Sequence, residues 1–499
     1  MKNLNKKMIR ISLLVVGVTL AASCSDFLDR PPQGQLTQAG FPVSGEDALL
    51  ATNAIYNILR NPGFNQGLFP ILDIMSDDAY KGSNPGDAAS TVGPYDSFQH
   101  ISTEGNISRW WNTLFEGVKR ANVVINLVPT IDMESGLRDR YIAEARFLRA
   151  LFYFDIVRAW GDAPIITELD PPLGMARAPK AEVYTLIVSD LTQAIPDLPE
   201  RSTYGAGDIG RASKGAAKAL LAKVYLFLND FTNAEKYAME VINSGQYDLF
   251  SDFEMANSQA GDHGIESVFE IGSIGFEGVV NGGNQYGNTQ GVRGTPNRGW
   301  GFNRPSLELQ NAFEPNDPRL DATVIYLGEV LDGVTILGDG QTPDETRDAS
   351  NNLIEIECYN QKVWTPGNNV PTQFDYNRRL LRYADVLLMA AEALNENNKP
   401  NEALTQLNKV RQRARGGNSG ILPDITETNQ ALLRDIIFHE RRVELALEGH
   451  RFWDLVRTGR AATVLGPLGF VAGKHELLPV PQIEIDLTQG TWSQNPQWE

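Results

Sequence analysis

Two stretches of the sequence place aromatic side chains among glycine, asparagine and arginine residues. Sugar rings present flat apolar C–H faces, which stack on Trp or Tyr rings, while Asn, Asp, Gln and Arg side chains hydrogen bond to the hydroxyl groups. The stretches 77–105 and 275–304 therefore predict a binding site for a neutral glycan. The candidate ligand-binding residues are Asp77, Asp78, Tyr80, Tyr95, Asn284, Tyr286, Arg298, Trp300 and Arg304.

Aromatic residues in loops also act as local packing anchors, so a structural role is the alternative for each of these rings. Residues 275–301 contain nine of the 45 glycines, with Tyr286 and Trp300 among them. Such a stretch is predicted not to form the interior of a helix, and it is too long for a simple connector. Because binding groups tend to lie on loops held by a rigid scaffold, we favour the binding interpretation.

A glycine pattern elsewhere in the chain resembles a nucleotide-binding loop. Gly205, Gly207 and Gly210 match G-x-G-x-x-G and precede a predicted helix. The nucleotide interpretation requires a hydrophobic strand directly before the pattern, and the chain has Pro196 and Pro199 there instead. We interpret these glycines as a loop that leads into a helix, and we expect no nucleotide cofactor.

The remaining catalytic and metal-binding patterns are incomplete. His439 and Glu440 begin a zinc-protease motif, but Val443 replaces its second histidine, and the acids and bases that follow predict an ion-paired structural helix. The five histidines show no ligand spacing, so we expect no metal site and no catalytic residue. A glycosidase stays open as an alternative, because folding can bring two of the 62 acidic residues together.

The amino terminus carries the features of a bacterial lipoprotein signal. A basic start is followed by the apolar run 11–22 and by small residues directly before Cys24. We expect cleavage of residues 1–23 and acylation of Cys24, with residues 24–45 as an extended tether; a plain signal peptide is the alternative. The apolar run is too short to span a membrane as a helix, and no later stretch is long enough.

The composition excludes some partners. The chain has 499 residues, a formal net charge of −18 and two cysteines. A protein this acidic repels phosphate backbones, so we expect no nucleic-acid partner. If lipid occupies Cys24, then Cys358 has no intrachain partner, and stability has to come from helix packing.

Helical spacing of apolar residues dominates the chain from Glu46 onward. Trp110 and Trp111 are expected in the core, and strands are predicted only at 267–271 and 477–485. We divide the chain into an N-terminal helical region (46–270), an irregular ligand region (271–377) and a C-terminal helical region (378–499). The predicted helices lie approximately at 46–60, 108–128, 141–160, 180–194, 213–229, 231–243, 378–397, 401–414 and 428–448.

Two helix pairs resemble each other in sequence. Residues 218–242 and 385–410 both contain a helix, a short polar turn and a second helix. Tyr225 precedes Ala234 by nine residues, and Ala393 precedes Ala403 by ten, so large residues on one helix can pack against small ones on the next. This pattern is typical of tetratricopeptide-type repeats, although two unrelated helical hairpins would match it as well.

Several motifs together resemble the SusD/RagB family of Bacteroidetes outer-membrane lipoproteins. They follow the family's order from one end of the chain to the other, and only the Leu of the lipobox, Leu20, is displaced by one position. The motifs are Cys24 to Pro31 and the segments 143–164, 211–230, 381–394, 440–459 and 477–498.

The resemblance implies a mainly helical protein in which four tetratricopeptide-like helix pairs support an irregular, loop-rich ligand region. It implies a lipid-anchored protein of the outer membrane, on the cell surface. Members of the family cover a SusC-like TonB-dependent transporter, capture a nutrient, usually an oligosaccharide, and deliver it without chemistry. The loops 77–105 and 275–304 correspond best to the family's variable ligand loops. The alternatives are a surface glycosidase, a tetratricopeptide-type scaffold for protein or peptide partners, and a lid for another nutrient.

Overall fold

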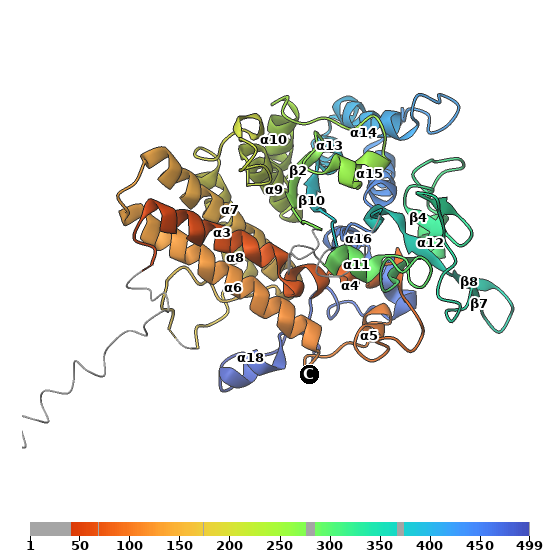
Figure 1. Cartoon of the computed structure of the whole chain (residues 1–499), viewed down its shortest axis with the longest axis horizontal. Coiled ribbons are helices and arrows are strands. Elements are labelled where there is room, and N and C mark those ends of the chain that lie inside the picture. The colour runs from red at the N-terminus through yellow and green to blue at the C-terminus, as the bar shows by residue number, and fades with distance from the viewer. Residues whose placement is uncertain (1–40, 68, 173, 276–284, 367–373, 499) are drawn as a thin grey trace, which may run out of the picture.

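The computed structural model describes residues 41–67, 69–172, 174–275, 285–366 and 374–498. The protein is mainly helical, as predicted, with long helices on the left and along the top of Figure 1 and short strands on the right and near the centre. The longer helices are α3 (Gly45–Arg60), α6 (Gly105–Leu127), α7 (Ser135–Trp160), α8 (Lys180–Ala194), α9 (Lys214–Phe227), α10 (Phe231–Ile242), α13 (Tyr383–Glu396), α14 (Pro400–Ala414) and α15 (Gln430–Glu444).

The helices pack in chain order. Each of them from α3 to α10 lies against the next, α10 lies against α13, and α13 contacts both α14 and α15. The sequence sets where they begin: Ser44 and Asp47 form a capping box at α3, and the Ser213 hydroxyl accepts the Ala216 N–H at the start of α9. Gly205 and Gly210 lie in the turns before α9, as the interpretation of a loop leading into a helix requires.

Helix α7 lies at the centre of this array. Seventeen of its 26 residues are buried, including charged ones, as expected for a helix that is covered on nearly all sides. The ring of Trp160, at its end, packs against those of Trp110 and Trp111 with centroids 5.1 and 5.0 Å away. Trp110 and Trp111 are 0% and 3% exposed, which confirms that they are core residues.

The two similar helix pairs form as predicted and meet in space. Helix α9 packs on α10, and α13 packs on α14, with Ala234 and Ala403 buried in the contacts. The Tyr225 ring stacks on that of Tyr237, one turn beyond Ala234, at a centroid distance of 5.8 Å. Because α10 also packs on α13, the pairs are neighbours although the irregular segment separates them in sequence.

The described strands form short antiparallel pairs. The predicted strand 267–271 is confirmed, but residues 378–382, predicted as the start of a helix, form its partner instead: Leu381 pairs with Phe269, and both are buried. The pairs are β1 (Ala79–Gly82) with β3 (Phe302–Pro305), β2 (Ser267–Ile271) with β10 (Arg378–Arg382), β4 (Val324–Tyr326) with β9 (Cys358–Asn360), β5 (Val330–Leu331) with β6 (Val334–Thr335), and β7 (Glu345–Arg347) with β8 (Leu353–Ile356).

The predicted strand 477–485 is wrong. Leu478 and Val480 are buried, but they bond to the Ala159 carbonyl and to Gln494 instead of to a strand, and Pro481 begins a helix. The shorter helices are α4 (Phe69–Ile74), α5 (Gly93–Asp96), α11 (Gln285–Gln290), α12 (Leu307–Gln310), α16 (Arg451–Arg457), α17 (Ala461–Leu465) and α18 (Gln482–Leu487), beside a π-helical turn at Gly63–Gly67.

Helix α11 corrects a second expectation, since it lies in the glycine-rich stretch that was predicted not to form a helix interior. Its Gly287 is where the chain needs a residue without a side chain, because a Cβ there would come within 2.3 Å of the Phe374 ring. Glycine therefore permits close packing in this short helix. The packing against Phe374 offsets the conformational entropy that glycine loses when it becomes helical.

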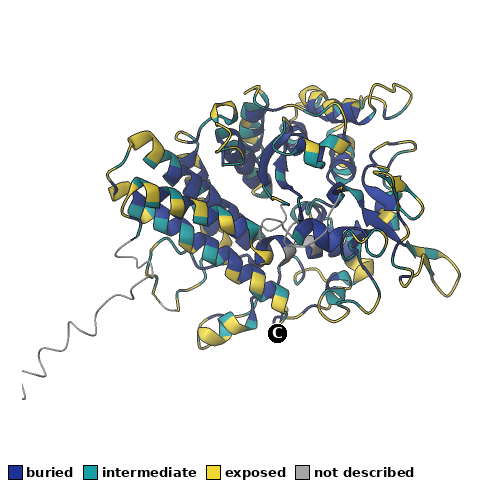
Figure 2. Ribbon diagram, viewed as in Figure 1, coloured by how far each residue is buried: buried dark blue, intermediate teal, exposed yellow. Residues whose placement is uncertain are grey.

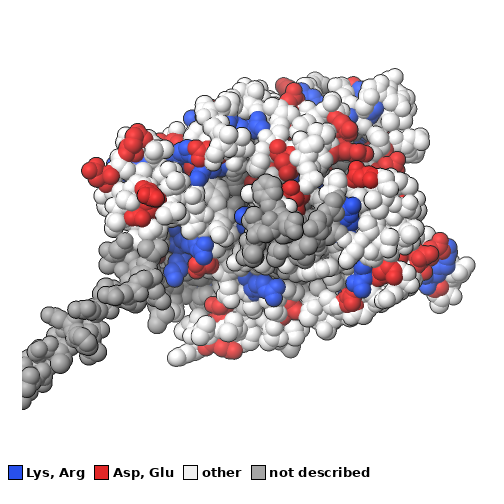
Figure 3. All heavy atoms as spheres, in the orientation of Figure 1, with Lys and Arg blue, Asp and Glu red and all other residues white. Residues whose placement is uncertain are grey.

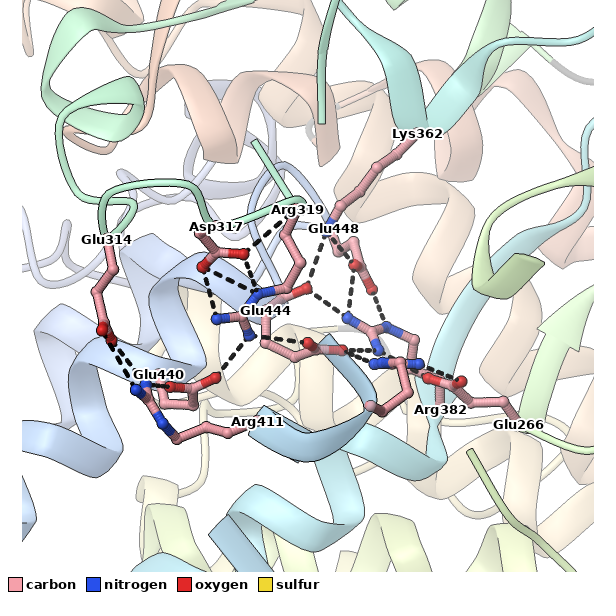
Figure 4. Close-up of polar contacts among 11 residues, drawn as sticks. Glu266, Glu314, Asp317, Arg319, Lys362, Arg382, Arg411, Glu440, Glu444 and Glu448 are labelled. Atoms are coloured by element: carbon pink, nitrogen blue, oxygen red, sulfur yellow. Dashed lines mark hydrogen bonds and ion pairs between the residues drawn. The ribbon is translucent and has the colours of Figure 1, made fainter. Parts of the chain in front are cut away.

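A network of buried ion pairs, which we term the ion-pair core, surrounds α15 (Figure 4). Arg319 is fully buried and bonds to Asp317 and Glu440 at 2.8 and 2.6 Å. The prediction that α15 is an ion-paired structural helix is thereby confirmed. The core links the irregular segment to β2, β10, α14 and α15; its members are Glu266, Glu314, Asp317, Arg319, Lys362, Arg382, Arg411, Arg413, Glu440, Glu444 and Glu448.

Burial follows the helical array in Figure 2, and among the described residues no helix is long and apolar enough to cross a membrane. Cys358 is buried and forms no disulfide with a described residue, and burial raises the pKa of its thiol to about 12. Cys24 and the segments 1–23 and 24–40 lie outside the described residues.

Candidate functional site

The two stretches that the sequence singled out are joined by the β1–β3 ladder. Tyr80 pairs with Arg304, and Gly82 pairs with Phe302. The turn after Gly82 approaches the second stretch closely, because the Ser83 N–H donates to the Gly301 carbonyl at 2.5 Å. Loops that are more than 170 residues apart in sequence therefore form one surface.

Between these loops lies a groove of about 370 Å³, which we term the Trp300 groove. Its walls come from α4, from the loop between β1 and α5, from the first turns of α6, and from α11 and β3. Apolar side chains form one part of the lining and polar ones another; the members are Ile71, Ile74, Ala88, Thr91, Val92, Glu104, Gly105, Asn106, Arg109, Thr289, Trp300 and Phe302.

The half-buried indole of Trp300 gives the groove an aromatic face. Its backbone is fixed, because its N–H donates to the Asn288 carbonyl at 2.8 Å, and the next N–H, of Gly301, donates to Gly291 at 2.9 Å. Phe302 follows at the start of β3. A ring carried on a backbone that is already fixed can stack on the apolar face of a sugar without ordering of the main chain on binding.

The polar side of the groove is formed by the start of α6. Arg109 is exposed and forms no ion pair with another described residue, so its guanidinium donors are available. Glu104 is already engaged, since its Oε2 accepts the Asn106 N–H at 2.8 Å and the Tyr95 hydroxyl at 3.2 Å. The arrangement supplies free donors beside an aromatic face.

Asp77 and Asp78 serve the scaffold. Asp77 forms a bidentate pair with Arg451 at 2.8 and 2.9 Å and also contacts Arg442 at 2.8 Å. Asp78 is fully buried and bonds to Arg442 at 2.7 Å. Burial opposes ionisation of both: it raises the pKa of Asp78, whereas at Asp77 the two arginines outweigh it and lower the pKa.

Tyr80 and Arg304, which face each other across the ladder, are also engaged within the chain. The Tyr80 hydroxyl donates to Glu308 at 2.9 Å, so this donor is already used within the chain. Arg304 is 4% exposed and pairs with Glu355 at 2.6 Å. Both residues hold the two loops together, and neither lines the groove.

Tyr95 and Tyr286 correct the expectation of exposed rings. Tyr95 is 0% exposed and stacks on His100 at 4.8 Å, so its contribution to the groove is the hydrogen bond to Glu104. Tyr286 is 3% exposed, with Tyr376 stacked on it at 6.0 Å and the Arg378 guanidinium 4.5 Å from its ring centroid. With their faces covered, neither ring can stack on a ligand in this conformation.

Arg298 lies near the groove without lining it. Its NH1 donates to the Thr365 carbonyl at 2.6 Å, and its guanidinium lies 4.8 Å from the Trp364 ring centroid. Asn284 lies outside the described residues. Of the candidate residues that the structure describes, Trp300 is the one that lines the groove.

Sequence reasoning missed the polar side of the groove. Thr91 and Thr289 lie within the selected stretches, but a threonine carries no distinctive pattern. Asn106 and Arg109 lie three residues apart at the start of a helix, which places them on one face. No local signal marks Arg109: it has no acidic residue three or four positions away, but neither has Arg149, which pairs with the distant Asp190 at 2.7 Å.

A larger cavity of about 720 Å³ lies elsewhere, between α6, residues 164–172 and 174–175, and α18. Its lining is mainly apolar, with groups such as Phe115, Pro171 and Leu487, beside polar ones such as Asn112 and Lys119, and none of its members comes from the stretches 77–105 or 275–304. No cluster of potential metal ligands occurs among the described residues. On the face drawn in Figure 3, acidic and basic side chains are interspersed and form no continuous basic patch.

Comparison with known proteins covers nearly the whole chain. Residues 73–226 match the family described as "Starch-binding associating with outer membrane", and residues 265–498 match the SusD family. The chain is 30% identical to SusD-like protein P2 of Formosa agariphila, over 98% of this chain and 99% of that protein.

Solved structures agree with this match. A laminarin-binding SusD-like protein has a TM-score of 0.77 at 29% identity, and covers 91% of this chain with 100% of its own. Surface glycan-binding protein A of Bacteroides thetaiotaomicron, in complex with laminarihexaose, has a TM-score of 0.76 at 27% identity, with the same coverage. Sequence motifs, helical array and comparisons thus agree, and the chain belongs to the SusD/RagB family.

Proposed function

We propose that this protein is a glycan-binding protein of the cell surface and that the Trp300 groove is its binding site. The observation that carries the proposal is the combination, in one groove, of the half-buried Trp300 ring with Arg109, which forms no ion pair with a described residue. The similar structures that bind laminarin or contain laminarihexaose support a glycan as the ligand and make a β-glucan of this type the first candidate.

Binding in this groove requires no chemical step. The Trp300 ring stacks on a sugar face, and Arg109 donates hydrogen bonds to hydroxyl groups beside it. Because the groove is small and open to solvent, we expect dissociation constants in the micromolar to millimolar range. These correspond to binding free energies of about −4 to −8 kcal/mol. Such weak binding suits a protein that passes its ligand on.

The same groove argues against a glycosidase. Hydrolysis of a glycosidic bond by the usual route requires two carboxyl groups on opposite sides of the bond. Among the described residues that line the groove, Glu104 alone carries a carboxylate, and that group accepts bonds from Asn106 and Tyr95. We infer that the protein binds its ligand without cleaving it.

We further propose that acylation of Cys24 anchors the protein in the outer membrane and that it delivers its ligand to a SusC-like TonB-dependent transporter. The basic start, the apolar run and the small residues before Cys24 support the anchor. Membership of the family supports the partner. Cys24→Ala is expected to release the protein from the membrane fraction, and a cleaved variant that stays there would contradict lipid anchoring.

Isothermal titration of the mature protein with laminarin and a panel of plant, host and microbial glycans tests the binding site. Trp300→Ala is expected to weaken binding at least about tenfold. Trp364→Ala is the matched control, because this half-buried indole lies outside the groove and bonds to Asp332 at 2.6 Å.

Equal affinity in the wild type and the Trp300 variant would refute this site. Sustained release of reducing ends from any of the glycans would refute the binding-only function. If no glycan binds while a peptide or protein partner does, the tetratricopeptide-type scaffold becomes the better interpretation.

A further inference from the structure

The ammonium group of Lys81 is bound by three backbone carbonyl oxygens from a single loop. Its Nζ donates to the Gly82, Asn84 and Asp87 oxygens at 2.8, 3.1 and 3.0 Å. A lysine has three donors, so these bonds use all of them. Carbonyl oxygens that converge in this way resemble the first shell of a bound cation, and here the chain supplies the cation itself.

No carboxylate of a described residue forms an ion pair with Lys81. Asp87 and Asp96 lie nearby, but Asp87 is turned to Arg293 and to the Ser83 hydroxyl, and Asp96 accepts the Lys81 backbone N–H at 3.0 Å. The direct partners of the ammonium are therefore carbonyl groups, while the carboxylates of Asp87, Glu355 and Asp96 favour its charge from beyond ion-pair distance. Removal of the charge would leave the three carbonyl groups facing one another without the ammonium donors, although the Asn84 oxygen would keep the Asp87 N–H as a donor at 2.9 Å.

The loop that Lys81 holds forms a wall of the Trp300 groove. Directly after the last of these carbonyls, the Ala88 oxygen accepts the N–H groups of Thr91, Val92 and Gly93 at 3.1, 2.8 and 3.2 Å. Ala88, Thr91 and Val92 line the groove.

Two residues of this loop need support from elsewhere. Ser83 and Ala88 have φ angles of 56° and 48°, a region that residues with a side chain seldom adopt. The loop is thus not held by its own backbone preference. Phe302, which also lines the groove, contacts Lys81 directly, because its ring centroid lies 5.6 Å from the Lys81 Nζ.

We propose that the Lys81 ammonium acts as a built-in cation that fixes the loop 82–92 in its binding shape, which makes Lys81 a positioning residue of the Trp300 groove. Lys81 does not line the groove and acts through Ala88, Thr91, Val92 and Phe302. The proposal rests on the glycan-binding function proposed above for the groove, but the state of the loop can be measured without ligand.

Two substitutions separate charge from bulk. Lys81→Met keeps most of the side-chain volume and removes the charge, whereas Lys81→Ala also opens the space of a propylammonium group. In the ligand-free protein, both substitutions are expected to speed hydrogen exchange at the Thr91, Val92 and Gly93 amides. Both are also expected to weaken glycan binding about tenfold. Lys119→Met, at an exposed lysine on α6, is the control and is expected to change neither quantity.

Chemical rescue distinguishes an internal cation from a merely structural side chain. Propylammonium added to Lys81→Ala is expected to slow the exchange of the three amides and to restore part of the affinity. It should not do so in Lys81→Met, where the space is filled, and the neutral propanol should rescue neither variant.

Unchanged amide exchange in both variants, or equal rescue by propanol, would overturn the proposal. So would faster exchange with unchanged affinity, because the loop would then not position the ligand. If the wild type binds no glycan while exchange and rescue follow the expectation, the clamp of the loop by Lys81 is supported and the proposed glycan function fails.

Discussion

Arg319 and Arg109 carry the same guanidinium group in two regions of the molecule, the ion-pair core and the Trp300 groove. Arg319 is fully buried and bonds to Asp317, Glu440 and Glu444. Arg109 is exposed and forms no ion pair with a described residue. A buried charge needs partners to offset its desolvation, whereas an unpaired charge at a groove keeps its donors for a ligand. Pairing therefore separates the region that holds the fold from the region that can bind.

The largest expected effect is on stability. Arg319→Met fills a similar volume but leaves Asp317 and Glu440 buried with one partner fewer, so we expect the free energy of unfolding to fall by about 3–5 kcal/mol. Urea unfolding followed by far-ultraviolet circular dichroism measures this change. Arg347→Ala removes an exposed pair with Glu345 and serves as the control, with an expected change within about 1 kcal/mol. Equal changes in the two variants would break the comparison.

The helical array was predictable because apolar spacing reports which face of a helix is buried. The ranges of α3, α8 and α14 follow from it closely. It failed at residues 378–382 because pairing with β2 is a tertiary choice that local spacing does not encode.

The site was only partly predictable. Glycine and aromatic content located the two loops and Trp300, but the cover on Tyr286 comes from Tyr376, some 90 residues away in sequence. Arg109 and Arg304 are the same residue type near the same loops. Only the fold shows that Glu355 neutralises Arg304 and that no described residue pairs with Arg109.

Acid is expected to weaken the ion-pair core first. Burial would raise the pKa of Glu444, but Arg413, Arg382 and Arg319 outweigh it and lower the pKa from 4.5 to about 2. Ionised Glu444 therefore contributes stability that is complete above about pH 4.5 and is lost as the pH falls toward 2. The expected loss is of the order of 3 kcal/mol.

Urea unfolding at a series of pH values from about 6 to about 3 tests this dependence. Glu444→Gln is expected to be less stable at neutral pH and to lose less stability on acidification than the wild type. Glu402→Gln removes the same charge from the surface and is the control. If the free energy of unfolding of the Glu444 variant fell with decreasing pH as steeply as that of the wild type, other carboxylates would be responsible for the acid sensitivity.

A substitution in the Trp300 groove should change ligand affinity more than stability, the opposite of a substitution in the ion-pair core. Trp300→Ala is expected to weaken glycan binding about tenfold, or about 1.4 kcal/mol, while the midpoint of urea unfolding changes little because the ring is already half exposed. Titration calorimetry and urea unfolding of the same preparation measure both quantities. A large loss of stability with unchanged affinity would make Trp300 a packing residue and move the binding site elsewhere.

The smallest effect on stability is expected for Arg109→Met, the same substitution as at Arg319. Since Arg109 has no described ion-pair partner, its removal leaves no buried charge uncompensated, and the free energy of unfolding should stay within about 0.5 kcal/mol of the wild-type value. Glycan affinity should nevertheless fall, because the ligand hydroxyl groups lose a charged donor worth about 1.5–3 kcal/mol. Arg109→Lys, which keeps the charge but not the planar fork, should recover part of that loss. If Arg109→Met destabilised the protein as much as Arg319→Met does, Arg109 would belong to the scaffold, and pairing would no longer distinguish the two regions.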